Sequence, residues 1–364
     1  MEPITHLLTG ACLARAGFNR KAAYATVAMT VTAELPDLDV LWGVDGPVAA
    51  FQHHRGWTHT FVGMPLEAAA MVGVVWLWHR WRLKRSDAAV KTAAPVRWGW
   101  LFLSTLLAVG SHLLLDYTNN YGLRPFFPFN PRWYAGSIVF IFEPVIFVLL
   151  LGALVAPLLF GLIGSEVGVR RTPFRGRGWA IAALLGVVAL WGWRGIEKEK
   201  ALRLVAAGDF SGAGMGTEDA AAGRVQVVRV GISPHPITPF QWHVIVETPM
   251  YYQLASVDTL SGTVTTAKGD LFYKPPTTIA TLIAKRSWLG EAYLDWSQFP
   301  LVQEAARSTD PEDAGLTTVT FRDLRFMYDV PLMKGRTNAP LSGTVTVNDD
   351  RRIVSMEMDG REQR

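Results

Sequence analysis

Histidine and carboxylate side chains gather in a few short motifs in the first half of this 364-residue chain. In chain order these motifs are His6, Glu34-Leu-Pro-Asp37-Leu-Asp39, His53-His54-Arg55-Gly-Trp-Thr-His59, His112-Leu-Leu-Leu-Asp116 and Glu143. Imidazole and carboxylate are ligands that zinc and similar divalent ions prefer. Polar groups in a membrane-embedded, apolar sequence must pair, bind a metal or do chemistry. The motifs therefore predict a membrane-embedded metal site with a catalytic role.

His112 and Asp116 are separated by four positions, so on a helix they lie on one face, one turn apart. This spacing lets both side chains contact one ion. An interhelical hydrogen bond explains this pair, taken alone, equally well.

Three of the eight histidines fall within residues 53–59. We expect His54 and His59 to be metal ligands, with His53 in reserve. Arg55 is a candidate for binding an anion, because a guanidinium grips phosphate or carboxylate in two-pronged fashion. A polar interfacial loop without a metal is the alternative.

Asp37 and Asp39 follow a proline that ends a predicted helix. Alternating carboxylates can converge on one cation, or one can bind it while the other orients a histidine. An exposed acidic turn is the alternative. His6, at the start of a predicted helix, is a further candidate ligand.

Glu143 lies in an apolar stretch, directly before Pro144. An ionised side chain deep in a bilayer costs at least about 2.5–3.5 kcal/mol. We therefore expect Glu143 to be a metal ligand or a general base, and a structural hydrogen bond is the alternative. Asp39 is the other candidate for the base.

Hydropathy divides the chain into two regions. Residues 1–195 are nearly continuous apolar blocks, and residues 196–364 resemble ordinary soluble protein. We predict a polytopic membrane domain over 1–195, a juxtamembrane helix and linker over 196–223, and a β-rich domain over 224–364. The single cysteine, Cys12, excludes an internal disulfide and a cysteine-based zinc site.

The membrane domain is predicted to hold about six helices, two of them short. A spanning helix needs about 17–25 mainly apolar residues. Three segments meet this length, a fourth is marginal, and two are short enough to be re-entrant or buried within the bundle. In that order the segments are 61–79, 98–117 and 137–163, then 178–193, then 4–16 and 22–34.

Basic residues cluster in three loops, at 15–21, 80–97 and 170–177. Loops rich in Lys and Arg stay in the cytoplasm, so we interpret them as topology signals and expect no nucleic-acid binding. This arrangement predicts a multi-pass protein of the bacterial inner membrane. Every candidate ligand then lies at the outer face, and the carboxy-terminal domain is extracytoplasmic, although Arg194, Lys198, Lys200 and Arg203 count against this orientation. The amino terminus has no basic leader and predicts no removable signal peptide.

The second half predicts an α+β domain with a mostly antiparallel sheet. Strands are expected at 225–232, 242–247, 317–321 and 344–347, and a helix near 276–285. The sequence Leu-Ser-Gly-Thr-Val-Thr occurs at 260–265 and again at 341–346, as two edge strands of one sheet or by coincidence. A lid, a substrate-selecting module and a partner-binding module all fit this domain. No function is assigned to His235 or His243.

Four motifs together resemble a known family. They are Thr5-His6-Leu-Leu-Thr-Gly10, Leu-Pro36-Asp37-Leu-Asp39, His54-Arg55-Gly56-Trp-Thr58-His59-Thr and His112-Leu-Leu-Leu-Asp116. This pattern resembles the bacterial inner-membrane "membrane-bound metal-dependent hydrolase" family, domain of unknown function 457, over residues 1–195. That family is distantly similar to zinc-dependent phospholipase C and S1/P1 nucleases. The resemblance implies phosphoester hydrolysis at a cluster of zinc ions held by histidine and aspartate.

The chain has fewer histidines than those soluble enzymes use and lacks their amino-terminal tryptophan ligand, so we expect one or two ions, most simply Zn²⁺. The expected ligands are His6, Asp37, Asp39, His54, His59, His112, Asp116 and Glu143. The expected substrate is a membrane lipid or a lipid-linked phosphoester, attacked by metal-activated water, with Arg55 stabilising the developing charge. A membrane scaffold or regulator with a structural metal is the alternative.

Overall fold

The computed structural model describes residues 1–85, 95–166, 176–208, 226–236, 238–305, 315–328 and 339–363. The chain forms two units, each with its own apolar core. The first unit comprises Met1–Asp39 and Arg55–Gly195, and the second comprises Val40–His54 and Ile196–Arg364. Residues 40–54, which the sequence places in the membrane domain, therefore fold with the carboxy-terminal region.

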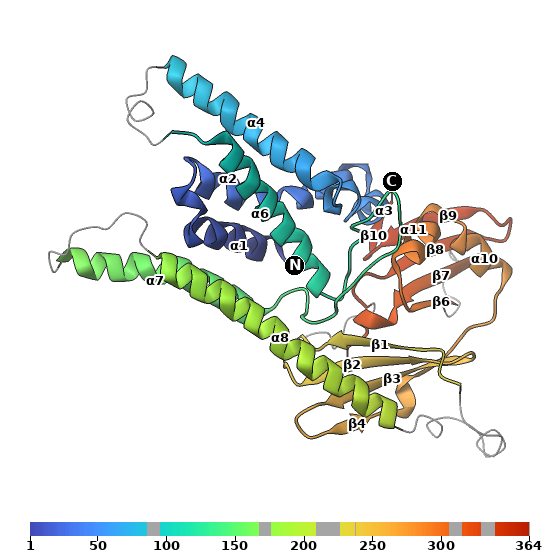
Figure 1. Ribbon diagram of the computed structural model, residues 1–364. Helices are drawn as coiled ribbons and strands as arrows, with labels where there is room; N and C mark the ends of the chain where they lie inside the picture. The colour runs from blue at the N-terminus through green and yellow to red at the C-terminus, as the bar shows by residue number, and fades with distance from the viewer. Residues whose placement is uncertain are drawn as a thin grey trace. The chain divides into compact units, whose positions relative to one another are not determined.

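The first unit is helical (Figure 1). Its helices are α1 (Pro3–Ala16), α2 (Ala25–Thr32), α4 (Gly63–Lys84), α6 (Trp98–Thr118), α7 (Pro144–Glu166) and the first part of α8 (Arg177–Ala207). Helix α6 packs against α1, α2 and α4, and α1 also packs against α2 and α7. Gly10 permits the close approach of α1 to α2, because a Cβ at this position would collide with the backbone carbonyl of Met29.

Side chains of α7 and α8 pack together in an apolar cluster. Ile146 and Leu150 of α7 are fully buried in it, beside Ala183 and Val187 of α8. The sequence predicts a helix from residue 137, but α7 begins at Pro144. A proline favours the first position of a helix and pushes the residue before it out of the helical region, so residues 137–143 form an irregular segment.

Two helices in the described part of the chain are long and apolar enough to cross a membrane, Trp98–Thr118 and Arg177–Ala207. A third span results if Pro47–His59 and Gly63–Lys84 count as one broken span. Pro144–Phe160 is a shorter apolar helix. The predicted helices at 61–79, 98–117 and 178–193 are thus present, with α8 extending beyond its predicted end to Ala207. The predicted short helices at 4–16 and 22–34 correspond to α1 and α2.

The second unit contains two antiparallel five-stranded sheets, which confirms the predicted fold class of a helical region followed by a β-rich domain. The first sheet has the order β1 (Arg229–Pro234), β2 (Gln241–Glu247), β3 (Tyr251–Asp258) and β4 (Thr263–Thr265), with β5 (Leu271–Tyr273) also paired to β3. The second runs β10 (Arg361–Glu362), β9 (Ile353–Met358), β8 (Gly343–Asn348), β7 (Leu316–Asp323) and β6 (Pro300–Glu304). The helices are α10 (Ile279–Lys285), α11 (Trp288–Trp296) and α3 (Pro47–His53).

The two Leu-Ser-Gly-Thr-Val-Thr sequences lead into β4 and β8, which belong to different sheets. Strand β8 lies between β7 and β9, so the explanation by two edge strands of one sheet is wrong. In the segment 196–223, predicted as a juxtamembrane helix and linker, α8 continues to Ala207, and residues 209–223 lie outside the described residues.

Segment Val40–His54 is tied into the second unit by specific contacts. The Phe51 ring lies 5.7 Å from that of Tyr293 and 5.2 Å from that of Trp296, centroid to centroid. The Gln363 side chain accepts a 2.9 Å hydrogen bond from the Val48 amide and donates one of 2.7 Å to the Asp45 carbonyl. These contacts explain why this stretch departs from the membrane region that surrounds it in sequence.

Candidate metal centre

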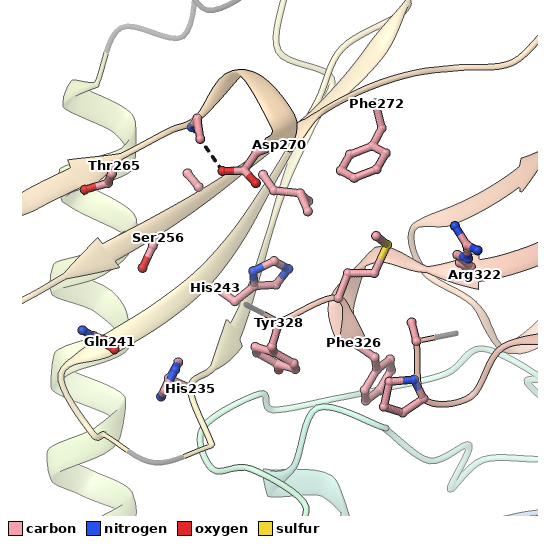
Figure 2. A pocket seen from close by; sticks show the side chains of 16 residues that line it. His235, Gln241, His243, Ser256, Thr265, Asp270, Phe272, Arg322, Phe326 and Tyr328 are labelled. Carbon is pink, nitrogen blue, oxygen red and sulfur yellow. Dashed lines mark hydrogen bonds between the residues drawn. The ribbon is translucent and has the colours of Figure 1, made fainter. Parts of the chain in front are cut away.

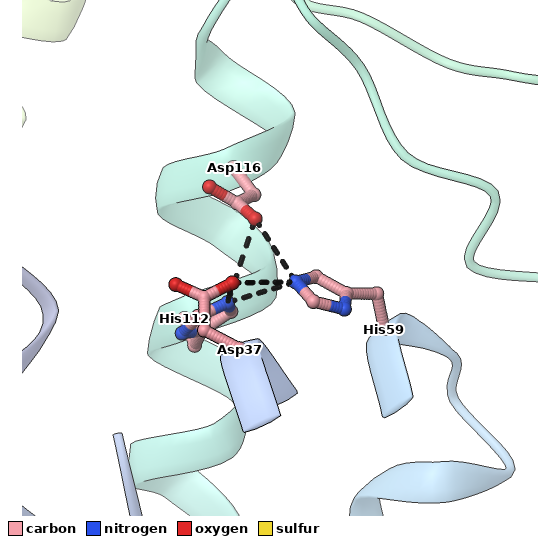
Figure 3. Close-up of side chains that lie close together, drawn as sticks. All are labelled: Asp37, His59, His112 and Asp116. Atoms are coloured by element: carbon pink, nitrogen blue, oxygen red, sulfur yellow. Dashed lines mark hydrogen bonds and ion pairs between the residues drawn. The ribbon is translucent and has the colours of Figure 1, made fainter. Parts of the chain in front are cut away.

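Four side chains from three elements of the first unit converge on one point (Figure 3). Asp37 comes from the 3₁₀ segment η2 (Leu35–Asp45), His59 from η3 (Trp57–His59), and His112 and Asp116 from α6. One ligand atom from each lies within 4.8 Å of the others, so the group could hold a metal ion. The side chains of His59, His112 and Asp116 are fully buried, whereas that of Asp37 keeps 16 % of its exposure.

Nitrogen and oxygen atoms face one another across short distances. His59 Nε2 lies 3.1 Å from His112 Nε2 and 3.3 Å from both Asp37 Oδ1 and Asp116 Oδ2. His112 Nε2 lies 3.6 Å from Asp37 Oδ1 and 3.4 Å from Asp116 Oδ2. The helical spacing of His112 and Asp116 thus turns both side chains toward the same point, as expected.

The outer nitrogen of each imidazole has its own acceptor. His112 Nδ1 lies 2.7 Å from the carbonyl oxygen of Ala33. Because a carbonyl only accepts, Nδ1 carries the proton. His59 Nδ1 lies 3.3 Å from Asp39 Oδ2 and 3.0 Å from Thr58 Oγ1. When each ring is neutral, these contacts leave a lone pair on both inner Nε2 atoms, as in metal-binding histidines held by an outer carboxylate or carbonyl.

Two imidazole lone pairs and two carboxylate oxygens therefore meet in a buried space. Such a set of acceptors requires a positive charge between them. In the protein alone, a proton on His59 supplies it. Burial raises the pKa of Asp37, but hydrogen bonding to His59 and the interaction with His112 outweigh burial and hold this pKa below its usual value. Two nitrogens and two oxygens are also a donor set that suits zinc.

Arg55 lies behind Asp116, where it contacts the protein itself. Its guanidinium contacts Asp116 Oδ1 at 2.8 Å, donates to the Gly122 carbonyl at 2.7 Å, and stacks 4.6 Å from the Tyr121 ring. Asp116 Oδ1 thus contacts Arg55 and the Met1 amino group. Oδ2 faces the histidines and has no hydrogen bond within the described residues. The side chain that the sequence assigns to anion binding here positions a candidate ligand.

Asp39 contacts both Arg55 and His59. Its Oδ2 accepts a 2.7 Å hydrogen bond from the backbone N–H of Arg55 and faces His59 Nδ1. Arg55 has a left-handed backbone with φ of 56°, a strained conformation for a residue other than glycine. The hydrogen bond to Asp39 helps hold it. Asp39 therefore orients His59, one of the two roles considered for it from sequence.

His6 contacts the cluster from its other side. The His6 ring stacks on that of His112, with centroids 3.7 Å apart, and its Nε2 lies 3.5 Å from Asp116 Oδ1 and 2.9 Å from the Met1 nitrogen. His6 is fully buried, and its stacked ring covers one face of the His112 ring and restrains its orientation. It is not one of the four residues whose ligand atoms converge.

Glu143 and His54 are not members of the converging group of four. Glu143 Oε2 is 3.9 Å from a guanidinium nitrogen of Arg194 in α8, whose Nε donates to the Ile138 carbonyl at 3.1 Å. His54 belongs to the second unit, where it follows α3, and the neighbouring His53 ring stacks on Trp42. Four of the eight proposed ligands, Asp37, His59, His112 and Asp116, thus form the buried group, and Asp39 and His6 contact its members.

Asn119 contacts a candidate ligand, and sequence reasoning missed it. Its Nδ2 donates to Asp116 Oδ1 at 3.4 Å, while its Oδ1 accepts from the Tyr121 amide at 2.8 Å. It follows Asp116 by three positions, and Asn119-Asn120 is a fully buried polar pair at the end of an apolar helix. Two consecutive asparagines at the end of this apolar helix were the sequence signal that could have identified the residue.

Comparisons with known proteins agree with the predicted membrane location of the helical region. Residues 1–201 match the family described as YdjM inner membrane protein. The chain belongs to the YdjM inner membrane protein family. The cluster lies wholly within the part that matches this YdjM family.

A relative of this YdjM-family chain is an uncharacterized protein, YfhP, of Bacillus subtilis (strain 168). The two are 25 % identical over 162 residues, which cover 42 % of this chain and 45 % of YfhP. The chain thus spans somewhat less than half of that relative's length. No solved structure matches this YdjM-family chain. The prediction that residues 1–195 belong to an inner-membrane family is thus confirmed.

Proposed function

We propose that this YdjM-family protein is a metal-dependent hydrolase that cleaves a phosphoester in a membrane lipid or lipid-linked substrate. The observation that carries the proposal is the convergence of four acceptor atoms, from Asp37, His59, His112 and Asp116, within 4.8 Å of one another. The outer contacts of both histidines direct their lone pairs inward. Zn²⁺ is the ion that this nitrogen and oxygen set suits best.

His59, His112 and Asp116 would hold the ion, because they are the three fully buried members of the set. A divalent ion supplies Lewis acidity, which polarises a phosphoryl oxygen and makes water acidic enough to attack near neutral pH. Arg55, Asp39 and Asn119 fix the directions of these ligands through the contacts described above.

Asp37 is the candidate general base. Its carboxylate is the partly exposed member of the set, and Figure 3 shows its second oxygen turned away from His59. A carboxylate at this position can accept a proton from an approaching water molecule through that oxygen. Asp39 is less suited to the role proposed from sequence, because its Oδ2 is already engaged by Arg55 and His59.

The ends of two helices support a site at the outer face of the membrane. Helix α4 begins four residues after His59 and carries Arg82 and Lys84 in its last turn. Helix α6 follows Arg97 and ends just beyond Asp116. The cluster therefore adjoins the start of α4 and the end of α6, while basic residues mark the opposite ends, which the positive-inside rule places in the cytoplasm. A lipid head group is then the natural substrate.

The test combines metal content with hydrolysis. Protein purified in detergent is assayed by elemental analysis and with a panel of phosphodiesters and phospholipids. His59→Ala and Asp116→Ala should each lose bound metal and activity, whereas His79→Ala should retain both, because His79 lies near the other end of α4 and contacts Tyr24. Full activity in both cluster variants would defeat the proposal.

A structural metal site is the second candidate function. Four protein ligands form a closed site of the kind that structural zinc adopts, and the observed set has four members. In that case His59→Ala would lose metal and thermal stability, and the wild-type protein would hydrolyse none of the panel.

A further inference from the structure

A cavity of about 740 Å³ lies in the second unit, among residues to which the hydrolase proposal gives no role (Figure 2). Side chains from β2, β3 and β4 form one wall, and Phe326, Met327 and Tyr328 after β7 face them. Pockets of 300–1,000 Å³ with apolar walls and a few placed polar groups are typical of small-molecule sites. This cavity falls within that range.

Strand register places a row of polar side chains along the sheet wall. His243 of β2 is paired with Ser256 of β3, which is paired with Thr265 of β4. Directly paired residues share one face of a sheet, and the adjacent residues along each strand point to the opposite face. Trp242 and Val244 accordingly turn to the opposite face, where they are buried in the cluster that includes Ala201 of α8.

His243 presents an acceptor within this row. Its Nε2 donates a 2.8 Å hydrogen bond to the Leu324 carbonyl, which leaves the lone pair on Nδ1. Burial lowers the pKa of His243, so the ring is neutral at neutral pH. With the hydroxyls of Ser256 and Thr265, the row offers one acceptor and two groups that both donate and accept.

The two charged side chains in the wall, Arg322 and Asp270, have opposite signs. The Arg322 Nε is buried and makes no hydrogen bond with any residue that the structure describes. Asp270 accepts a 3.1 Å hydrogen bond from the Ala267 amide. Because the two formal charges cancel, the cavity does not select for a strongly anionic or cationic ligand, yet it keeps a buried donor for a ligand oxygen.

Aromatic rings form the remaining surface. Phe326 and Tyr328 are buried, Phe272 is half-buried, and the rings of His243 and Tyr328 have centroids 5.0 Å apart. Ring faces suit flat apolar surfaces. The cavity thus combines aromatic faces with a row of groups that bind hydroxyls.

We propose that this cavity binds a neutral glycan, with one face of a sugar ring on the aromatic side chains and its hydroxyls on the row His243, Ser256 and Thr265. A sugar ring carries many hydroxyls that donate and accept, has an apolar face, and bears no charge. This proposal is independent of the hydrolase site, and a glycan-binding domain would direct the membrane protein to saccharide-bearing material.

Binding is tested with the full chain in lipid nanodiscs, because maltoside detergents carry the proposed ligand class. An array of neutral and acidic glycans is screened, and the strongest neutral ligand is titrated by calorimetry. Thr265→Trp should block the cavity, because Thr265 is exposed on edge strand β4 and lines the cavity. Thr263→Trp, an exposed position two residues away that does not line the cavity, is the matched control and should bind normally.

Arg322→Met removes the buried donor, while Arg361→Met changes an exposed arginine on edge strand β10. The first should weaken glycan binding about ten-fold, as expected for one hydrogen bond from a charged group, and the second should have no effect. The proposal is overturned if no neutral glycan binds, or if Thr265→Trp and Arg322→Met bind as the wild type does. It is equally overturned if Thr265→Trp abolishes binding of palmitate while leaving glycan binding intact, because the cavity is then a lipid site.

Discussion

The Nε2 atoms of His59 and His112 face each other across 3.1 Å. Each ring is fixed from outside, His112 by the Ala33 carbonyl and His59 by Asp39. A metal ion held by His59, His112 and Asp116 would therefore link η3 to α6. Stability and metal binding are then coupled, because an ion that binds the folded state stabilises it by mass action.

Asp39→Asn should weaken metal binding without abolishing it. The substitution leaves the four converging side chains in place but replaces the carboxylate that faces His59 Nδ1. Loss of an outer partner of this kind costs about 10–100-fold in metal affinity. Competition with a chromophoric chelator measures the change. Asp45→Asn, at the exposed end of the same 3₁₀ segment, should bind metal as the wild type does, and equal affinities in both variants would exclude the orienting role of Asp39.

Arg55→Met should destabilise the metal-free protein strongly. It leaves the fully buried Asp116 with the Met1 amino group as a cationic neighbour but without its guanidinium, and removing one partner from a buried ionic group costs about 3–5 kcal/mol. Saturating zinc should recover much of the loss in a thermal melt, because the ion neutralises the same carboxylate. Arg132→Met, at an exposed arginine beside Tyr134, is the control. An Arg55→Met melt that does not respond to zinc would contradict binding by Asp116.

Glu34→Gln should make stability less dependent on pH. Burial, followed by the nearby charge of Asp37, raises the pKa of Glu34 to about 8. A carboxyl with a raised folded-state pKa stabilises the fold at low pH, and that contribution is lost as pH rises from the unfolded value of about 4.3 toward 8. The wild type should therefore lose melting temperature between pH 5 and about 9, and the glutamine variant should lose less. Identical pH profiles would show that Glu34 ionises normally.

Gly10→Ala should destabilise the first unit and weaken metal binding together. The added Cβ would meet the Met29 carbonyl and approach the Ala33 Cβ to 2.8 Å, and the Ala33 carbonyl is the acceptor for His112. Gly73→Ala in α4 is the matched control, because nothing lies within 4 Å of its added Cβ. There, alanine should stabilise the helix by about 0.5–1 kcal/mol. Thermal melts with zinc titration compare them, and a neutral Gly10→Ala would show that α1 and α2 can separate without cost.

Sequence reasoning reached the parts of the site that depend on local spacing. His112 and Asp116 share a helix face by periodicity alone, and Asp37 follows Pro36 shortly after the end of α2. The broad fold was likewise predictable from hydropathy, because apolar blocks of spanning length and alternating β-branched segments are local patterns.

The remaining assignments depend on long-range packing, which single-sequence patterns do not encode. Glu143 pairs with Arg194, a residue 51 positions later on α8, and nothing in the sequence around either residue selects the other. Arg55 has the charge of an anion-binding group, yet its partner is Asp116 on a helix that lies distant in sequence. Charge and residue type predict that such groups need partners, while the fold decides which partners they meet.

The segment between Asp39 and Arg55 determines where this protein can be divided into separately expressed parts. The two residues are joined by a 2.7 Å hydrogen bond, and everything between them folds with the carboxy-terminal unit. A gene cut after residue 195 would therefore not yield an intact membrane half. Phe51 would lose its ring contacts with Tyr293 and Trp296. The apolar segment would then lack its packing partners, although its two flanking residues, Asp39 and Arg55, contact the proposed metal ligands.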